Sequence, residues 1–190
     1  MSADFAAQRA NMVESQVRTA DVTDYAIQDA MRIAPRESLL PAERRYLAYA
    51  DVEVPYAPGR WLLKPRDIGK LLQALRPRPG ERALAIAAPY GAMLLELIGL
   101  TVERLDEGDL KSPAAGYDLV ICEGAVARTP EGWIAALADG GRLGVVERVG
   151  AVGRAKLYVR AETGVVGSRD LFDCGPPIMA GFEPARGFAF

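Results

Sequence analysis

Residues 83–102, ALAIAAPYGAMLLELIGLTV, carry a single charged side chain, Glu96, and they decide which class of fold the chain can adopt. An apolar run of this length could cross a membrane as a helix. Pro89 and Gly91 interrupt the run at its centre, however, and this combination is typical of a turn between two buried elements. We therefore expect a buried strand, a turn and a buried helix in this stretch, and no membrane partner.

The sequence around this stretch alternates between the patterns of strands and helices. Short apolar runs indicate strands that are covered on both faces, and the runs between them have the spacing of helices. The expected strands are residues 82–88, 101–106, 117–122, 142–147, 155–160 and 165–172, and an expected helix spans 92–98. This order predicts an α/β fold with an open, mostly parallel sheet that ends in an antiparallel pair.

The first third of the chain has the pattern of helices instead. Residues 54–59, VPYAPG, are rich in proline and glycine and are expected to form a loop. We expect a single domain over residues 1–190, with an N-terminal helical region at 1–78 and an α/β core at 79–190. After Pro65, apolar residues recur at the spacing of one helical face, at Ile68, Leu71, Leu72 and Leu75.

The charge balance argues against a nucleic-acid or membrane partner. The chain has 190 residues, and its 23 basic and 25 acidic side chains give a net charge of −2. A protein that binds nucleic acid or an anionic membrane through its overall field would be basic. Residues 1–10 also lack the charged start and the apolar run of a secretory signal. We therefore expect a cytoplasmic protein.

Histidine is absent from the sequence, and its absence excludes several kinds of catalytic site. Ser-His-Asp and Cys-His nucleophiles, histidine-ligated zinc and a histidine general base all require this side chain. The two cysteines, Cys122 and Cys174, lie far apart and form no CxxC pair. We expect them to be buried or incidental thiols, and we expect no metal site.

A series of short motifs runs through the chain in a fixed order. The N-terminal part consists of MVESQVR at 12–18, VTD at 22–24, AM at 30–31, PRE at 35–37 and AYAD at 48–51, and GGRL at 140–143 follows the strand YDLVI at 117–121. This series resembles the protein-L-isoaspartate O-methyltransferase family. The resemblance covers nearly the whole chain, and its N-terminal part is more specific than GGRL, which many Rossmann-like methyltransferases share.

The resemblance implies a Rossmann-like methyltransferase fold, with a seven-stranded, doubly wound sheet that binds S-adenosylmethionine. The implied activity is methyl transfer to the carboxylate of isoaspartyl residues in damaged proteins. This chemistry does not need histidine, because a sulfonium is already a reactive methyl donor and a carboxylate is already a nucleophile.

The turn after the first core strand departs from the family's pattern. The resemblance implies a glycine-rich turn there, so that the backbone can approach the cofactor closely. Residues 87–91, AAPYG, keep only Gly91. Pro89 has no N–H, and Tyr90 is expected to put a large side chain on the rim of the site. We interpret the segment as a turn that only connects strand and helix, and an altered cofactor mouth is the other interpretation.

The next connection is too short for the family's pattern. A Rossmann-like site needs an acidic residue after the second strand to hold the ribose hydroxyls. Asp106 ends that strand, Asp109 resembles part of a later Gly-Asp motif, and only residues 107–116 precede the next strand. A helical crossover needs about a dozen residues or more, so we expect that one β-α unit is deleted and six strands remain. Gly91, Asp106 and Asp109 are the candidate cofactor-binding residues, although both acids could be solvated loop carboxylates.

The expected acceptor site lacks its family residue. The resemblance implies a serine in a Gly-Gln-x-Ile-Ser-x-Pro-like segment, and residues 59–65, GRWLLKP, place Leu63 at that position. A hydrocarbon side chain cannot donate or accept a hydrogen bond, so we assign no catalytic residue. Lys64 or Arg66 could attract a substrate carboxylate and Trp61 could be a binding platform, although solvated charges and packing are simpler interpretations.

These three departures predict a degenerate, shortened member of the family. Signals for packing persist while signals for the site are lost, which is the pattern of a catalytically silent binding or scaffold protein. Its partner would be another protein or a second copy, with Phe172, Phe182, Phe188 and Phe190 as candidate contacts. One alternative is an active or remodelled S-adenosylmethionine-dependent protein carboxyl methyltransferase with isoaspartyl protein substrates. Another is a module that senses the cofactor or a nucleotide without reacting.

Overall fold

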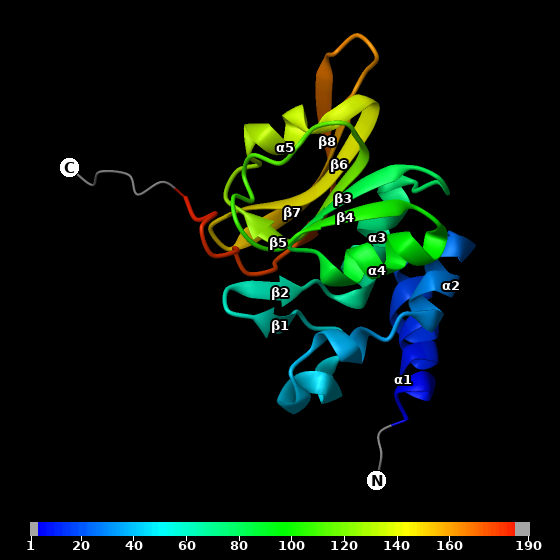
Figure 1. Cartoon of the computed structure of the whole chain (residues 1–190). Coiled ribbons are helices and arrows are strands. Elements are labelled where there is room, and N and C mark those ends of the chain that lie inside the picture. Colours follow the sequence, from blue (N-terminus) through cyan, green and yellow to red (C-terminus); the bar gives the residue numbers. More distant parts are fainter. Residues whose placement is uncertain (1–3, 185–190) are drawn as a thin grey trace, which may run out of the picture.

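The computed structural model describes residues 4–184, in which helices cover a six-stranded sheet (Figure 1). The strands lie in the order β4-β3-β5-β6-β7-β8. β3 pairs in parallel with β4 and with β5, and β5 pairs in parallel with β6. β7 is antiparallel to both β6 and β8. The expected six-stranded, mostly parallel sheet with a terminal antiparallel pair is confirmed. The bounds are β3 (Arg82–Ile86), β4 (Thr101–Leu105), β5 (Tyr117–Val126), β6 (Leu137–Val149), β7 (Val152–Arg160) and β8 (Val166–Cys174).

The stretch at 83–102 forms buried elements, as expected. It contains most of β3, the helix α4 (Pro89–Ile98) and the start of β4. The expected helix start at 92 is wrong: α4 begins at Pro89, because proline lacks an N–H and its fixed φ suits the first helical position. Among residues 4–184, no helix is long and apolar enough to span a membrane.

The connection from β4 to β5 is a loop. Residues 106–116 contain no helix, and β4 is the outermost strand on its side of the sheet. β3 therefore has one neighbour on each side, and no further parallel strand lies beyond β4 in the described part of the chain. This is the arrangement expected when one β-α unit is deleted.

The N-terminal part of the chain is mainly helical. Helix α1 (Phe5–Met12) continues through a π-helical turn (Val13–Val17), and α2 (Tyr25–Ile33) and α3 (Pro65–Leu75) follow. The loop expected at 54–59 is wrong, since β1 (Val54–Ala57) and β2 (Arg60–Leu62) form an antiparallel hairpin. Gly59 permits the tight turn because its φ of +67° lies in the left-handed region that favours glycine.

The side chains of successive residues in the central strands pack into two different apolar cores, one on each face of the sheet. Ala85 and Ile121 belong to the core under α1, α2, α3 and α4, whereas Leu84 and Val120 belong to a second core on the other face. Helix α5 (Glu131–Ala135) contributes Trp133 to that second core. The first core joins residues from both sides of position 78 and so fastens the helical region to the sheet. The domain boundary at 78 itself stays a prediction.

Arg142 fastens the sheet to the end of α3. Its guanidinium donates to the carbonyls of Leu75 (2.5 Å), Arg76 (2.7 Å) and Asp118 (3.0 Å). It also forms an ion pair with Glu81 at 2.7 Å. The last carbonyls of a helix have no partner within the helix, and a cation there offsets the negative end of the helix dipole. Only 14% of the Arg142 side chain is exposed, so water could replace few of these bonds.

Replacing Arg142 with methionine should lower the free energy of unfolding by about 3 kcal/mol, since three carbonyls and the Glu81 carboxylate lose their donor. Urea denaturation followed by circular dichroism measures the loss. Arg154→Met is the matched control, because Arg154 pairs with Asp170 and Asp173 at an exposed position and should leave the denaturation midpoint nearly unchanged. Equal midpoints for the two variants would contradict the role given to Arg142.

Candidate functional site

The topology of the sheet favours one place for a ligand. β4 and β5 lie on opposite sides of β3, so the order of the strands reverses at β3. In open α/β sheets, ligands bind at such a switch point, beyond the carboxyl ends of the strands. Here the switch point is bounded by the turn after β3, the first residues of α4 and the end of β5.

The turn after β3 keeps the shape of a glycine turn without the glycine. Ala87 has a φ of +44°, in the left-handed region where a β-carbon costs free energy. Its N–H donates to the Leu105 carbonyl (3.0 Å), and its carbonyl accepts from the Tyr56 hydroxyl (3.2 Å). These two bonds hold the strained residue between β4 and the β1-β2 hairpin.

A buried carboxylate occupies the start of α4. Glu123 is fully buried, and its Oε2 accepts from the backbone N–H groups of Tyr90 (2.9 Å) and Gly91 (3.2 Å). Amides at a helix start carry partial positive charge and attract an anion. The pairing of β5 with β6 is irregular between Ile121 and Ala125, and such a bulge redirects a side chain. The chain thus supplies its own hydrogen-bond acceptor for these amides, at the place where a ligand would bind.

Arg36 and Tyr90 complete this buried cluster. Both side chains are fully buried, and the Arg36 guanidinium lies 4.6 Å from the centre of the Tyr90 ring. Arg36 donates from Nε to the Ala48 carbonyl (2.8 Å) and from Nη2 to the Leu63 carbonyl (2.6 Å). The expectation that Tyr90 lies on the rim of the site is wrong, because its ring stacks on a buried cation.

Burial controls the protonation of this cluster. Burial raises the pKa of Glu123 to about 7, against the opposing effects of Arg36 and of the Gly91 and Tyr90 amides. Burial also lowers the pKa of Arg36, while Tyr90 and Glu123 act in the opposite direction. Within residues 4–184, Glu123 Oε1, Arg36 Nη1 and the Tyr90 hydroxyl have no hydrogen-bond partner. All three side chains are fully shut off from solvent.

Residues 175–183, here called the strap, cover the same place. The Met179 N–H donates to the Ala125 carbonyl (2.8 Å), and the Ala125 N–H donates to the Pro177 carbonyl (3.1 Å). In Figure 1 the strap is red and passes between β5 and the β1-β2 hairpin. Met179 is fully buried, and a β-carbon on Gly124 would lie 2.6 Å from its Cγ. The strap therefore fills the space over the end of β5.

The three predicted cofactor residues differ in exposure and in their contacts. Gly91 is buried, and its amide already donates to Glu123. Asp106 is exposed directly after β4, beside the switch point. Asp109 is exposed farther along the loop, where its carboxylate accepts from the Lys111 N–H (3.0 Å). The roles of these residues as cofactor contacts stay predictions.

The residues of the expected acceptor segment have structural contacts. Leu63 is buried in the core under the helices. Lys64 forms an ion pair with Glu53 (3.9 Å), and Arg66 forms one with Asp51 (3.3 Å). Both cations thus have carboxylate partners within the protein.

The aromatic residues expected to contact a partner differ in exposure. Trp61 is half-buried in β2, and Phe172 is half-buried in β8. Phe182 is buried in the strap. Phe188 and Phe190 lie outside the described residues.

Three residues that shape this site were missed from the sequence: Glu123, Arg36 and Met179. A signal for Glu123 existed, because a charged residue followed by Gly124 directly follows the apolar run at 119–122. Arg36 belongs to the PRE motif, but nothing local indicates that it is buried. Met179 has no local signal, since its contact with β5 depends on the path of the strap.

The order and direction of the strands define a Rossmann-like methyltransferase architecture. No family model matches the chain. It is 33% identical over 185 residues to protein-L-isoaspartate O-methyltransferase 1 of Rhodopseudomonas palustris (strain HaA2), covering 82% of this chain and 75% of the relative. It is 32% identical over 217 residues to the protein-L-isoaspartate O-methyltransferase of Methylorubrum extorquens (strain PA1), and the match covers 96% of this chain and 92% of the relative. The chain belongs to the protein-L-isoaspartate O-methyltransferase family.

Solved structures agree on the fold. A protein-L-isoaspartate O-methyltransferase superposes with a TM-score of 0.69 at 16% identity, covering 91% of this chain and 66% of its own. A putative protein-L-isoaspartate O-methyltransferase from Plasmodium falciparum, in complex with S-adenosyl-L-homocysteine, superposes with a TM-score of 0.71 at 14% identity. The superposition covers 90% of this chain and 97% of that structure. The alignment with the Methylorubrum extorquens relative spans 217 positions against 190 residues here, so it opens gaps in this chain, which fits a deleted β-α unit.

The stability of the protein should fall by about 1 kcal/mol as the pH rises from about 6 to about 7.5. The pKa of Glu123 is about 7 in the folded protein against 4.5 for an ordinary glutamate, so the folded state holds a proton that the unfolded state has lost. Glu123→Gln should remove most of this fall, because its amide oxygen still accepts from both N–H groups and never ionises. The remainder belongs to Asp67, because burial raises its pKa to about 6. Urea midpoints measured across this pH range test the prediction.

Glu147→Gln is the matched control for this pH series. Burial raises the pKa of Glu147, but hydrogen bonds from Thr129 and Tyr158 outweigh burial and lower it to about 2. Its contribution to stability is therefore constant between about pH 6 and 7.5, and the variant should be less stable at each pH with an unchanged slope. A Glu123→Gln variant that keeps the slope of the parent protein would refute the assignment.

Proposed function

We propose that this chain is a family member that no longer transfers methyl groups and that acts by binding other proteins, with the cytoplasm as its expected location. The observation that carries the proposal is the Glu123 carboxylate on the amides of Tyr90 and Gly91. Those amides stand at the switch point and would face a ligand. Here both are used inside the protein.

S-adenosylmethionine does not fit the residues at the switch point. A cofactor there needs backbone that it can approach and space over the end of the strands. Glu123 seals the start of α4, and Met179 fills the space over Gly124. Moving the strap would also break its backbone hydrogen bonds with Ala125. No reaction step through this cofactor follows from the geometry.

The relatives favour a second candidate, an S-adenosylmethionine-dependent protein carboxyl methyltransferase that acts on isoaspartyl proteins. Two relatives that carry the name protein-L-isoaspartate O-methyltransferase are 33% and 32% identical to this chain. For this function the chain would have to displace Glu123 and the strap and bind the cofactor through Gly91, Asp106 and Asp109. A direct binding measurement separates the two candidates.

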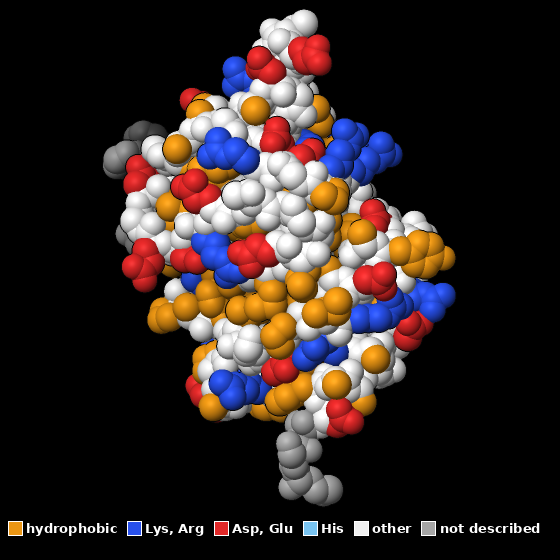
Figure 2. All heavy atoms as spheres, turned by 45° about the vertical axis from the view of Figure 1, so that its right-hand side comes forward, with side chains coloured by type: hydrophobic (Ala, Val, Ile, Leu, Met, Phe, Trp, Pro, Cys, Tyr) orange, Lys and Arg blue, Asp and Glu red, His pale blue; other side chains and the backbone are white. Residues whose placement is uncertain are grey.

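Exposed apolar side chains indicate where a protein partner would bind. Tyr25 (77% exposed) and Ile33 (61%) project from α2, and Leu97 (45%) projects from α4. Figure 2 shows hydrophobic side chains gathered in a band across the side of the molecule that carries these helices. The outer strand β4 instead exposes Glu103 and Arg104, and such charges disfavour strand pairing with another copy. We therefore expect a partner at the helical face and not at the β4 edge.

Isothermal titration calorimetry with S-adenosylmethionine and S-adenosylhomocysteine tests the loss of the cofactor site. We expect no saturable heat at millimolar ligand and no methylation of an isoaspartyl peptide. The Rhodopseudomonas palustris relative, measured in parallel, controls for the quality of the ligand and the peptide. Micromolar binding would overturn the proposal, and binding together with turnover would establish the second candidate.

Two variants identify what closes the site. Leu63→Ser restores the family's serine but should leave both readouts unchanged, because the cofactor still cannot enter. The double variant Glu123→Ala, Met179→Ala frees the amides and the space over β5, and it should gain weak cofactor binding. Circular dichroism verifies that each variant is folded. Activity in Leu63→Ser alone would show that the site was open from the start.

A further inference from the structure

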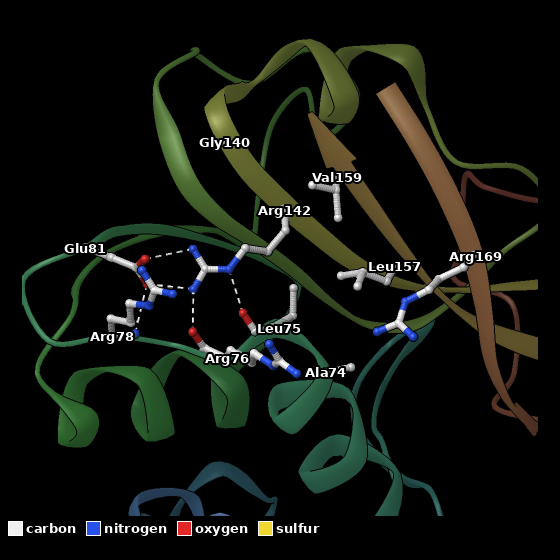
Figure 3. Close-up of a pocket in the computed structure, with 10 residues that line it drawn as sticks. All are labelled: Ala74, Leu75, Arg76, Arg78, Glu81, Gly140, Arg142, Leu157, Val159 and Arg169. Atoms are coloured by element: carbon white, nitrogen blue, oxygen red, sulfur yellow. Dashed lines mark hydrogen bonds and ion pairs between the residues drawn. The ribbon is translucent and has the colours of Figure 1, made fainter. Parts of the chain in front are cut away.

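A hollow of about 320 Å³ lies at the edge of the sheet opposite to the switch point (Figure 3). Residues at the end of α3 and the start of β6 form its base, and β7 and β8 form its wall. We call it the arginine hollow, because four of its lining residues are arginines: Arg76, Arg78, Arg142 and Arg169. It faces the amino ends of β3 and β6, so it is separate from the switch point.

The charges of the arginine hollow are unbalanced. Its lining contains four arginines and one acid, Glu81, in a protein whose net charge is −2. Glu81 is already committed, since both of its carboxylate oxygens accept from Arg142 (2.8 and 2.7 Å). Within residues 4–184, the other three guanidinium groups have no carboxylate within 4.0 Å. All three of these arginines are exposed, so an anion from solution can reach their guanidinium groups.

Arg76 stands in a backbone conformation that favours glycine. It is the residue after the last turn of α3, with φ of 48° and ψ of 62°. Most helices that end this way use glycine, because a β-carbon is strained in the left-handed region. Such strain tends to persist where a side chain has a function. Here the strained position carries an arginine whose side chain lines the hollow.

The hollow also has an apolar side. In Figure 3, Leu157 and Val159 of β7 lie above the space into which Arg76 and Arg169 extend. Arg142 is held back by the carbonyls at the end of α3 and neutralises them, so the negative end of the helix does not oppose an anion. A ligand would therefore meet free guanidinium groups on one side and hydrocarbon on the other.

We propose that the arginine hollow binds a small molecule in which a phosphate group is attached to a compact apolar group. Guanidinium groups bind phosphate oxygens through paired, charge-assisted hydrogen bonds. The volume is at the lower end of the range of ligand sites, which fits a compact molecule. The proposal is independent of the proposed function, because the two places lie at opposite edges of the sheet.

Phenyl phosphate is the probe, and calorimetry at constant ionic strength measures its binding. We expect saturable binding, with benzoate weaker because it carries less charge, and inorganic phosphate weaker because it lacks the ring. Arg76→Gly and Arg169→Gln should each weaken phenyl phosphate binding by about tenfold. Arg154→Gln is the matched control, since it removes the same charge from an exposed position outside the hollow and should leave binding unchanged.

The Arg76→Gly variant separates binding from folding. Glycine suits the left-handed backbone at this position, so the variant should melt at the same temperature as the parent protein or higher while losing affinity. Absence of saturable binding to the parent protein in the millimolar range would overturn the proposal. Equal affinity of the parent, Arg76→Gly and Arg169→Gln proteins would overturn it as well.

Discussion

The hydrogen bonds from the Tyr90 and Gly91 amides to the buried Glu123 carboxylate are the constraint on which the rest of this site depends. A helix start that is buried without an acceptor would leave strongly polar N–H groups unpaired. The charge of Arg36, from the N-terminal helical region, opposes the rise in the pKa of Glu123 that burial causes. Arg36 in turn donates to the carbonyls of Ala48 and Leu63, so it joins two segments that lie far apart in the sequence.

In this arrangement, backbone amides of the kind that bind ligands in other sheets bind a buried side chain of the protein itself. In a doubly wound sheet the amides at the switch point are available to a ligand because the protein leaves them uncovered. Here the bulge in β5 aims Glu123 at them, and the strap places Met179 over the adjacent Gly124. Ala87 has a positive φ, and its backbone N–H and carbonyl are both hydrogen-bonded within the protein.

Local sequence patterns were enough to predict the sheet, but not the side chains that are buried at its switch point. The strands, the terminal antiparallel pair and the missing β-α unit follow from apolar periodicity and from the length of one connection, which are properties of neighbouring residues. The burial of Tyr90, Arg36 and Glu123 depends on contacts between segments far apart in the chain, so no window of sequence contains it. The β1-β2 hairpin was missed for a different reason. Its strands are short and contain Pro55, and proline usually argues against a strand.

The two edges of the sheet differ in whether their charged side chains have partners of opposite charge. At the carboxyl edge, Glu123 and Arg36 are both buried, and each shifts the pKa of the other toward its charged form. At the amino edge, Arg142 and Glu81 also neutralise each other, yet Arg76 and Arg169 remain unpaired beside them within residues 4–184. Folding alone does not require those two cations, since Arg142 already caps α3. A charge that folding does not need, at a position where the backbone favours glycine, is better explained by what it attracts than by what it supports.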